Sequence, residues 1–356
     1  MKPRERKGTG ITFDKLFRTA LIVVPIGVLG NVVFSFLATD RDVLTSLLEF
    51  PRHYLGLAVG LALLPWLTNT LRLYIWTRFF GYPISLRDAY QITLAMDLGA
   101  AVSPTAVGGG FFRWGLLVQR GVSPGAAVSL TTLPTLEDGL FFLIAVPMAV
   151  YLSASWNLPV FQQLGPMLEG NFGIAAPILF ALLLLAWVGA RLILSGGFGP
   201  RPQKGGIRWF GRTRRRLRTA WRDGRESFRV IFRRGKAWFA LSMSLTAIHW
   251  IARYSVVSAL VAFLGIPVDP VLFWLLQWVV FSLMALIPTP GAVGGAEASF
   301  YFIYGALLPA SVLGVATAGW RFLTFYLQLG LAAILFTLMN MQRPWVEAKP
   351  LDEGRA

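Results

Sequence analysis

The sequence predicts an all-α, polytopic integral membrane protein with about six full spans and two re-entrant helical hairpins in inverted repeats. Its 356 residues are 55% hydrophobic and only 14% charged, and the mean hydropathy is +0.60. A soluble protein of this length needs a more polar surface, so the composition is typical of a chain that lies in a bilayer. Similar Pro- and Gly-containing phrases interrupt two apolar stretches, Ser-Pro-Thr-Ala-Val-Gly-Gly-Gly at 103–110 and Thr-Pro-Gly-Ala-Val-Gly-Gly-Ala at 289–296.

Six apolar stretches are long enough to form membrane-spanning helices, which need about 20 residues each. The predicted spans are 19–38, 53–77, 125–152, 174–196, 237–263 and 309–340. The first stretch is similar to the apolar part of a signal peptide, but no small-residue cleavage site follows it. We therefore expect it to be an uncleaved first helix.

Two pairs of shorter apolar segments flank the Pro- and Gly-containing phrases, 87–102 with 110–118 and 270–287 with 296–307. At about 1.5 Å per residue, each segment is too short to cross a core of about 30 Å comfortably. Proline and glycine break helices, and broken backbone in a bilayer is tolerated only where protein or a wet cavity satisfies it. We predict a re-entrant hairpin around 87–118 and another around 270–307, with a transport site between them.

The distribution of Lys and Arg predicts the orientation of these segments. The loop 153–173 has no Lys or Arg, whereas 197–236 holds fourteen of them. By the positive-inside rule the basic segments are cytoplasmic, so the first hairpin enters from the cytoplasm and the second from the opposite side. The predicted division is a cytoplasmic basic segment at 1–18, a first membrane half at 19–196, a cytoplasmic amphipathic loop at 197–236, a second membrane half at 237–340 and a cytoplasmic tail at 341–356.

The basic loop carries a regular apolar stripe, made of Phe210, Leu217, Trp221, Phe228 and Phe232. Arginines occupy the other faces, and this pattern favours an amphipathic helix that lies on the anionic lipid of the cytoplasmic leaflet. The alternative is a linker that charge alone keeps inside. The net charge of +16 would also suit nucleic acid, but the positive-inside rule explains it, and we expect no nucleic-acid partner.

The two membrane halves match one another when position 81 is aligned with position 265 and the rest of the chain is shifted by the same amount. The matched residues are Gly81 with Gly265, Pro83 with Pro267, Pro104 and Thr105 with Pro288 and Thr289, and Gly121 with Gly305. The glycines inside the phrases need a further slip of two positions. This order predicts an internal repeat, and chance matching between two Gly- and Ala-rich halves is the alternative.

The same alignment places Arg113 opposite Glu297 and Glu137 opposite Arg321, with the signs of charge exchanged. An ionised side chain at mid-membrane costs about 2.5–3.5 kcal/mol on the mildest scale. Such groups persist only where they pair, face water or meet a charged ligand, and two Arg and two Glu can neutralise one another. The four residues form either a structural network that joins the halves or a network that handles lipid or ions.

Two further acids, Asp97 and Asp138, lie at membrane depth. They are candidate proton sites if transport is coupled to protons, and a water-facing or helix-capping role is the alternative.

Each glycine run also precedes a short predicted helix. The first N–H groups of a helix have no helical partners and carry the positive end of its dipole, which suits phosphate or carboxylate. The candidate residues for an anionic head group are Ser103, Thr105, Gly108, Gly109, Arg113, Glu137, Thr289, Gly291, Gly294, Gly295, Glu297 and Arg321.

Several of these residues resemble the lysylphosphatidylglycerol synthase transmembrane-region family, also called flippase-like domain membrane proteins. The resemblance covers roughly residues 15–340 and is carried by Arg72 before Trp76, by 104–113, by Glu137 and above all by 287–297. It implies a lipid translocase-like domain, which in multiple peptide resistance factors precedes a soluble aminoacyl-transfer domain that we do not expect here. The family positions matched are Arg113, Glu137, Gly291, Gly294, Glu297 and Arg321. Glu137–Asp138 replaces the family's frequent Glu-Arg, and Gly291–Ala292 replaces its usual pair of glycines.

The chain has no Cys, only two His, and no HExxH, Walker A, GxSxG or EF-hand pattern, so we expect no metal or cofactor. We expect a non-enzymatic flippase or scramblase of the cell inner membrane, acting on an anionic or aminoacylated phospholipid. One alternative is a head-group enzyme that uses Glu137, Asp138 and His249 as acid and base. Another is a scaffold that recruits a lipid-synthesising enzyme through the basic loop.

Overall fold

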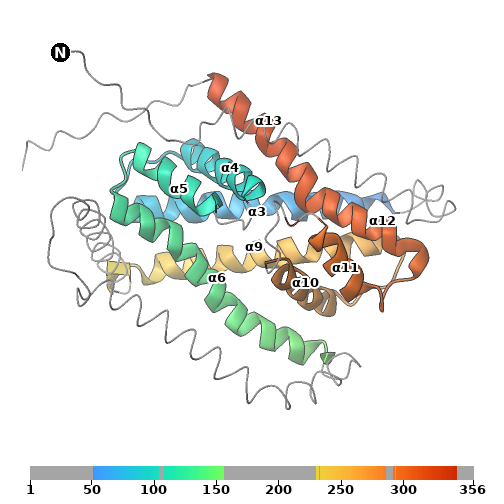
Figure 1. Ribbon diagram of the computed structural model, residues 1–356. Coiled ribbons are helices and arrows are strands. Elements are labelled where there is room, and N and C mark those ends of the chain that lie inside the picture. Colours follow the sequence, from blue (N-terminus) through green and yellow to red (C-terminus); the bar gives the residue numbers. More distant parts are fainter. Residues whose placement is uncertain are drawn as a thin grey trace, which may run out of the picture.

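The computed structural model describes residues 51–103, 108–155, 230–231, 233–285, 292 and 294–342 (Figure 1). The secondary-structure elements of this part of the chain are all helices. Four helical stretches in it are long and apolar enough to cross a membrane, so the all-α membrane fold is confirmed there. The predicted spans 19–38 and 174–196, the predicted apolar stripe of the basic loop and nearly all of both cytoplasmic end segments lie outside the described residues.

Helices α3 (Arg52–Phe79) and α9 (Lys236–Phe263) form the long central pair and run in opposite directions (Figure 1). Their bounds agree with the predicted spans 53–77 and 237–263 to within two residues. One buried cluster contains Ala58 of α3 together with Val257 of α9. Small and β-branched side chains let the two backbones approach closely, as is usual where helices pack in a bilayer.

The first predicted hairpin is formed by α4 (Leu86–Val102) and α5 (Gly108–Gln119). A capping box begins α4, in which the Ser85 hydroxyl accepts the Asp88 N–H and the Asp88 carboxylate accepts the Ser85 N–H. A Cβ at Gly109 would lie 2.8 Å from a backbone carbonyl oxygen of α4. Glycine is therefore required where α5 packs against α4.

The second predicted hairpin is formed by α10 (Pro270–Ala285) and α11 (Gly295–Tyr304). The Asp269 carboxylate caps α10 because it accepts the N–H groups of its first turn at 2.9 and 3.1 Å. Across the hairpin, the hydroxyl of buried Tyr304 donates to the Phe273 carbonyl at 3.0 Å. This hydrogen bond joins the end of α11 to the first turn of α10.

Each hairpin is followed by a long helix. The first is α6 (Pro124–Leu152), and the second runs through α12 (Ala310–Arg321), the π-helix η3 (Phe322–Tyr326) and α13 (Leu327–Gln342). These bounds agree with the predicted spans 125–152 and 309–340. A π-helical turn is rare and is frequent at functional sites, and here it follows directly after a charged residue of the site described below.

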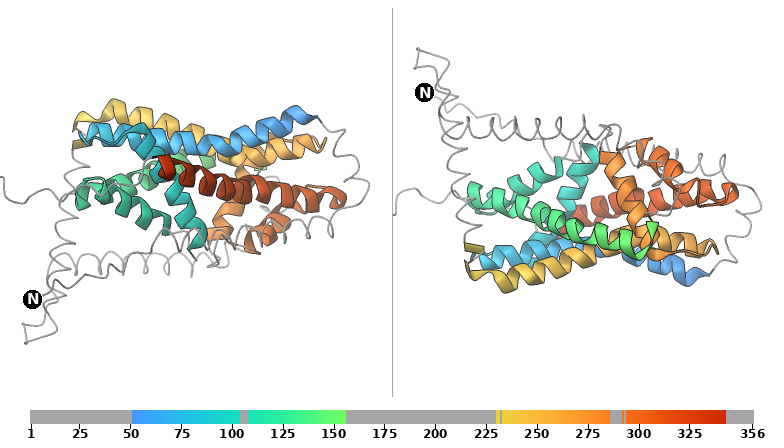
Figure 2. Two further views of the ribbon diagram at one scale, coloured as in Figure 1. Left: turned by 90° about the horizontal axis from the view of Figure 1, so that it is seen from above. Right: turned by 90° about the horizontal axis from the view of Figure 1, so that it is seen from below.

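The two halves have the same order of helices. The alignment of position 81 with position 265 also brings the start of α3 onto the start of α9, and the start of α4 onto the start of α10. Both α3 and α9 are followed by a glycine with positive φ, Gly81 at +77° and Gly265 at +75°, a conformation that favours glycine. The α4–α5 pair lies toward one end of the central pair and α10–α11 toward the other (Figure 2). An inverted repeat would require such an arrangement, and both the repeat and the placement of each helix in the bilayer stay predictions.

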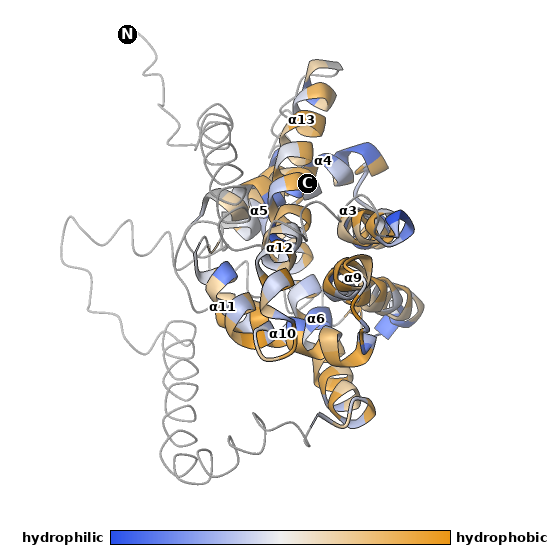
Figure 3. Cartoon of the chain, turned by 90° about the vertical axis from the view of Figure 1, so that its right-hand side faces the viewer, coloured by the Kyte–Doolittle hydropathy of each residue, from blue (hydrophilic) through white to orange (hydrophobic). Residues whose placement is uncertain are grey.

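The halves are interlocked through two main clusters of buried apolar residues. Ala58 and Ala62 of α3, in the first half, pack in the cluster of the second half. Ala332 and Phe336 of α13, in the second half, pack in the cluster of the first. Apolar residues dominate the helices, and polar residues gather on parts of α4 and at one end of α3 (Figure 3).

Candidate functional site

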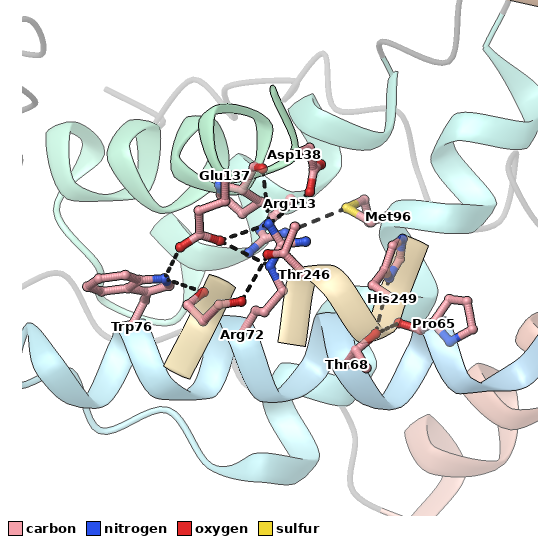
Figure 4. A network of polar contacts seen from close by, with 12 residues as sticks. Pro65, Thr68, Arg72, Trp76, Met96, Arg113, Glu137, Asp138, Thr246 and His249 are labelled. Atoms are coloured by element: carbon pink, nitrogen blue, oxygen red, sulfur yellow. Dashed lines mark hydrogen bonds and ion pairs between the residues drawn. The ribbon is translucent and has the colours of Figure 1, made fainter. Parts of the chain in front are cut away.

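Glu137 lies near the middle of α6, is fully buried, and has hydrogen bonds to both carboxylate oxygens (Figure 4). Arg72 of α3 donates to Oε2 from Nε at 3.1 Å and from Nη2 at 2.8 Å. The indole N–H of Trp76 lies 3.0 Å from Oε1 and also 3.0 Å from the Ser242 hydroxyl of α9. This cluster therefore fixes α3, α6 and α9 to one another.

Arg72 also forms an ion pair with the second acid of α6, Asp138. Its Nη2 lies 3.0 Å from Oδ1 of Asp138 and donates to the Pro134 carbonyl at 3.0 Å. Arg72 and Glu137 are almost completely buried, whereas the Asp138 side chain is 26% exposed. With both acids ionised, this cluster has one positive and two negative charges and attracts a further cation.

That cation is Arg113 on α5, which is 5% exposed. Its charge interacts with those of Arg72, Glu137 and Asp138, but no carboxylate oxygen of the described residues lies within 4.0 Å of its nitrogens. Its hydrogen bond goes from Nη1 to the Met96 sulfur at 3.9 Å (Figure 4), and a thioether is a weak acceptor. Nε has no hydrogen-bond partner in the described part of the chain. Arg113 is thus a buried guanidinium that lacks a strong acceptor within this part.

The second half contains an ion pair at the start of α11. Nε of Arg321 lies 3.2 Å from Oε1 of Glu297. The other oxygen of Glu297 accepts the backbone N–H of Gly294 at 2.8 Å. The Arg321 guanidinium also lies over the Phe325 ring of η3, 4.2 Å from its centroid. The Glu297 carboxylate therefore accepts a hydrogen bond from one of the N–H groups that were predicted to bind an external anion.

The mutual neutralisation expected of two Arg and two Glu is found for Arg321 and Glu297. Glu137 instead forms its ion pair with Arg72, and Arg113 has no carboxylate within ion-pair distance among the residues described. Alignment of the two halves could not reveal this difference, because position 256, which corresponds to Arg72, is Val.

The remaining predicted residues lie around the two hairpins. Gly108 begins α5, Gly109 packs against α4, and Gly295 begins α11. The Ser103 hydroxyl donates to the Ala100 carbonyl at 3.2 Å at the end of α4. Thr105, Thr289 and Gly291 lie outside the described residues. A role of these residues in head-group binding stays a prediction.

Asp97 and Asp138 belong to different contacts. The Asp97 carboxylate, on α4, accepts the indole N–H of Trp66 at 2.7 Å, and the cation that acts on it is Arg253 of α9. Asp138 has Arg72 as its partner.

His249 is buried on α9, and its Nδ1 lies 3.1 Å from the Thr68 hydroxyl (Figure 4). No hydrogen bond or ion pair of the described residues joins it to Glu137 or Asp138. The three groups named for the enzyme alternative are therefore not joined directly within this part of the chain, and that alternative stays a prediction. Within residues 51–342, gaps excepted, no three His, Asp or Glu side chains gather in a way that suits a metal ion.

Reasoning from sequence did not identify three of the residues that interact with the acids of the site. Arg72 and Trp76 were noted for their resemblance but not paired with Glu137, and Arg253 was overlooked. Each arginine lies inside a predicted span, so a search for every charge within the spans would have found both.

The sequence matches the family described as the lysylphosphatidylglycerol synthase TM region over residues 19–332. A UPF0104 membrane protein of Archaeoglobus fulgidus is 24% identical over 287 residues, which cover 76% of this chain and 81% of that protein. The resemblance predicted from residues 15–340 is confirmed. Because the match extends over most of the sequence, the chain belongs to the lysylphosphatidylglycerol synthase transmembrane-region family, a lipid-related family of membrane proteins.

Proposed function

We propose that this protein moves a lipid with an anionic head group across the membrane, and that Arg113 binds the anion. The observation that carries the proposal is the buried Arg113 guanidinium, which has no carboxylate within 4.0 Å among the described residues. Arg72 and Arg321 each have such a partner. A guanidinium presents a planar set of donors that matches phosphate oxygens, so a phospholipid phosphate suits the free donors of Arg113.

The surroundings of Arg113 favour a ligand that enters and leaves. Arg113 lies on the short helix of the first hairpin, and the nearby acids Glu137 and Asp138 favour its charge, whereas Arg72 opposes it. A ligand that replaces only a thioether contact has little to displace. Binding is thereby favourable without a permanent salt bridge that would hold the lipid in place.

An aminoacylated phospholipid also fits this site. Its phosphate would bind Arg113, and its ammonium group would approach the partly exposed Asp138 carboxylate. Asp138 stands where the family often has Arg, so this chain would accept a cationic head group more readily than a relative with Arg there.

The path for the head group would run between two hairpins that enter the cell inner membrane from opposite sides, with both ends of the chain in the cytoplasm. The opposite directions of α3 and α9 and the positions of the hairpins support this arrangement. The acyl chains would remain in the surrounding lipid. We propose transport rather than catalysis, since Glu137 is held by Arg72 and Trp76 and does not contact His249.

The proposal is tested by lipid exchange between leaflets of vesicles that contain the purified protein and fluorescent phosphatidylglycerol. We expect the wild-type protein to speed exchange, Arg113→Gln to slow it about tenfold or more, and Arg113→Lys to keep part of it. Arg78→Gln is a matched control, because Arg78 is exposed at the end of α3. Wild-type protein that gives no more exchange than empty vesicles, across several anionic lipids, would rule the proposal out.

A further inference from the structure

A second arginine lies deep within an apolar helix and has no ion-pair partner among the residues that the structure describes. Arg253 lies well inside α9 and is closer to its end at Phe263 than to its start at Lys236. At about 1.5 Å per residue, it is roughly 15 Å from the nearer end of the helix. A charge at this depth carries a cost and is a candidate functional group by default.

The interactions of Arg253 involve both hairpins, through a ring contact with one and a charge interaction with the other. Its guanidinium lies over the Phe281 ring of α10, 5.2 Å from the centroid, a favourable cation–π distance. Its charge acts on the Asp97 carboxylate of α4, and on His249 and Tyr254 of its own helix. Arg253 thus contacts the first helix of the second hairpin and acts electrostatically on the first helix of the first hairpin.

Arg253 differs from the structural arginine of the site. Arg72 is 1% exposed and forms ion pairs with two carboxylates, which is what a cation that only joins helices requires. Arg253 is partly exposed, and within the described residues it has no hydrogen bond and no carboxylate oxygen within 4.0 Å. Asp97, which is the acid that acts on it, is hydrogen-bonded to Trp66 instead. The donors of Arg253 remain available to a ligand from outside this part of the chain.

We propose that Arg253 is a second anion-binding residue, which takes the phosphate of the lipid head group between the two hairpins, with Asp97 as the charge that competes for it. This inference rests on the proposed function and extends it, because the head group would pass from Arg113 over a second cation rather than over one alone. The competing carboxylate keeps the anion from binding too tightly to leave. Removing the negative charge of Asp97 must then strengthen binding, whereas removing the positive charge of Arg253 must weaken it.

Binding of fluorescent phosphatidylglycerol to the purified full-length protein tests this inference, with each variant first shown to be monodisperse and as thermally stable as wild type. We expect Arg253→Gln to raise the Kd about tenfold or more, Arg253→Lys to raise it less, and Asp97→Asn to lower it severalfold. Arg78→Gln should leave the Kd unchanged. Competition with inorganic phosphate separates the two sources of the anion: displacement of the lipid probe at Arg253 by millimolar phosphate would indicate a free-phosphate site and contradict the lipid assignment.

The opposite shifts of two neighbouring variants distinguish a ligand from a structural role. If Asp97→Asn weakens binding as much as Arg253→Gln, or if neither changes the Kd, the inference is wrong. Lipid exchange in vesicles is a separate readout. Binding that depends on Arg253 without any exchange would refute the proposed function and leave this inference standing. Exchange that depends on Arg113, combined with an unchanged Kd in Arg253→Gln, would refute this inference and leave the proposed function standing.

Discussion

The replacement Glu137→Gln is expected to cost about 3 kcal/mol of the free energy of unfolding. Glu137 is fully buried and accepts three hydrogen bonds, two from Arg72 and one from Trp76. Removing one partner of a buried ion pair costs about 3–5 kcal/mol, because the remaining charge stays buried. Gln keeps one acceptor oxygen and the side-chain shape, and Arg72 keeps Asp138 as a carboxylate partner at 3.0 Å. We therefore expect the loss to fall at the lower end of that range.

The assay is reversible unfolding of the purified protein by increasing SDS in mixed micelles, followed by Trp fluorescence. Asp269→Asn is the matched control, since it makes the same change from carboxylate to amide at the exposed cap of α10. Asn caps a helix about as well as Asp, so this variant should stay within about 0.5 kcal/mol of wild type.

A double-mutant cycle isolates the ion pair from other effects. Arg72→Met and Glu137→Gln should together destabilise the protein by less than the sum of the single changes, with a coupling of about 1–3 kcal/mol. A Glu137→Gln protein that unfolds within about 1 kcal/mol of wild type, or a cycle that is additive, would refute the view that this pair joins α3 to α6.

Three further predictions concern local structure. Gly109→Ala should destabilise the protein by about 1–3 kcal/mol, since its Cβ would meet the backbone of α4 at 2.8 Å, whereas Gly115→Ala has open space and should be neutral in the same unfolding assay. Gly294→Ala should cost about 1–3 kcal/mol because φ is +79° there; an unchanged unfolding midpoint would contradict the positive φ. Trp66→Phe removes the donor to Asp97 and should cost about 1–3 kcal/mol, and infrared spectroscopy of the Asp97 carboxylate should detect the lost hydrogen bond, with an unaltered band as the contrary result.

Much of the helical structure could be predicted from the sequence, because bilayer-spanning helices leave long apolar runs and breaks leave Pro and Gly. The predicted segment 87–102 and helix α4 differ by one residue, and both long helices of the second half begin where the apolar runs begin. The offset between the two halves, read from glycines and prolines, also relates the starts of the observed helices.

The partners of the charged residues were harder to predict. A repeat alignment shows which residues occupy equivalent places, but not which side chains meet across helices. Glu137 contacts Arg72, which is distant in sequence on α3, and the position in the second half that corresponds to Arg72 carries no charge. Gly109 was named as a place where a ligand approaches the backbone, and the structure shows that α4 packs closely there. Sequence cannot distinguish close approach of a ligand from close approach of a neighbouring helix, and a role of Gly109 in head-group binding stays a prediction.

Labelling of single cysteines can show whether the two hairpins enter the membrane from opposite sides. The chain contains no native Cys, so Gln119→Cys at the end of α5 and Ala306→Cys just after α11 can each be the sole reactive thiol, and both positions are exposed. With a membrane-impermeant thiol reagent, we expect Gln119→Cys to react only from the cytoplasmic side and Ala306→Cys only from the opposite side. Reaction of both from the same side would contradict it.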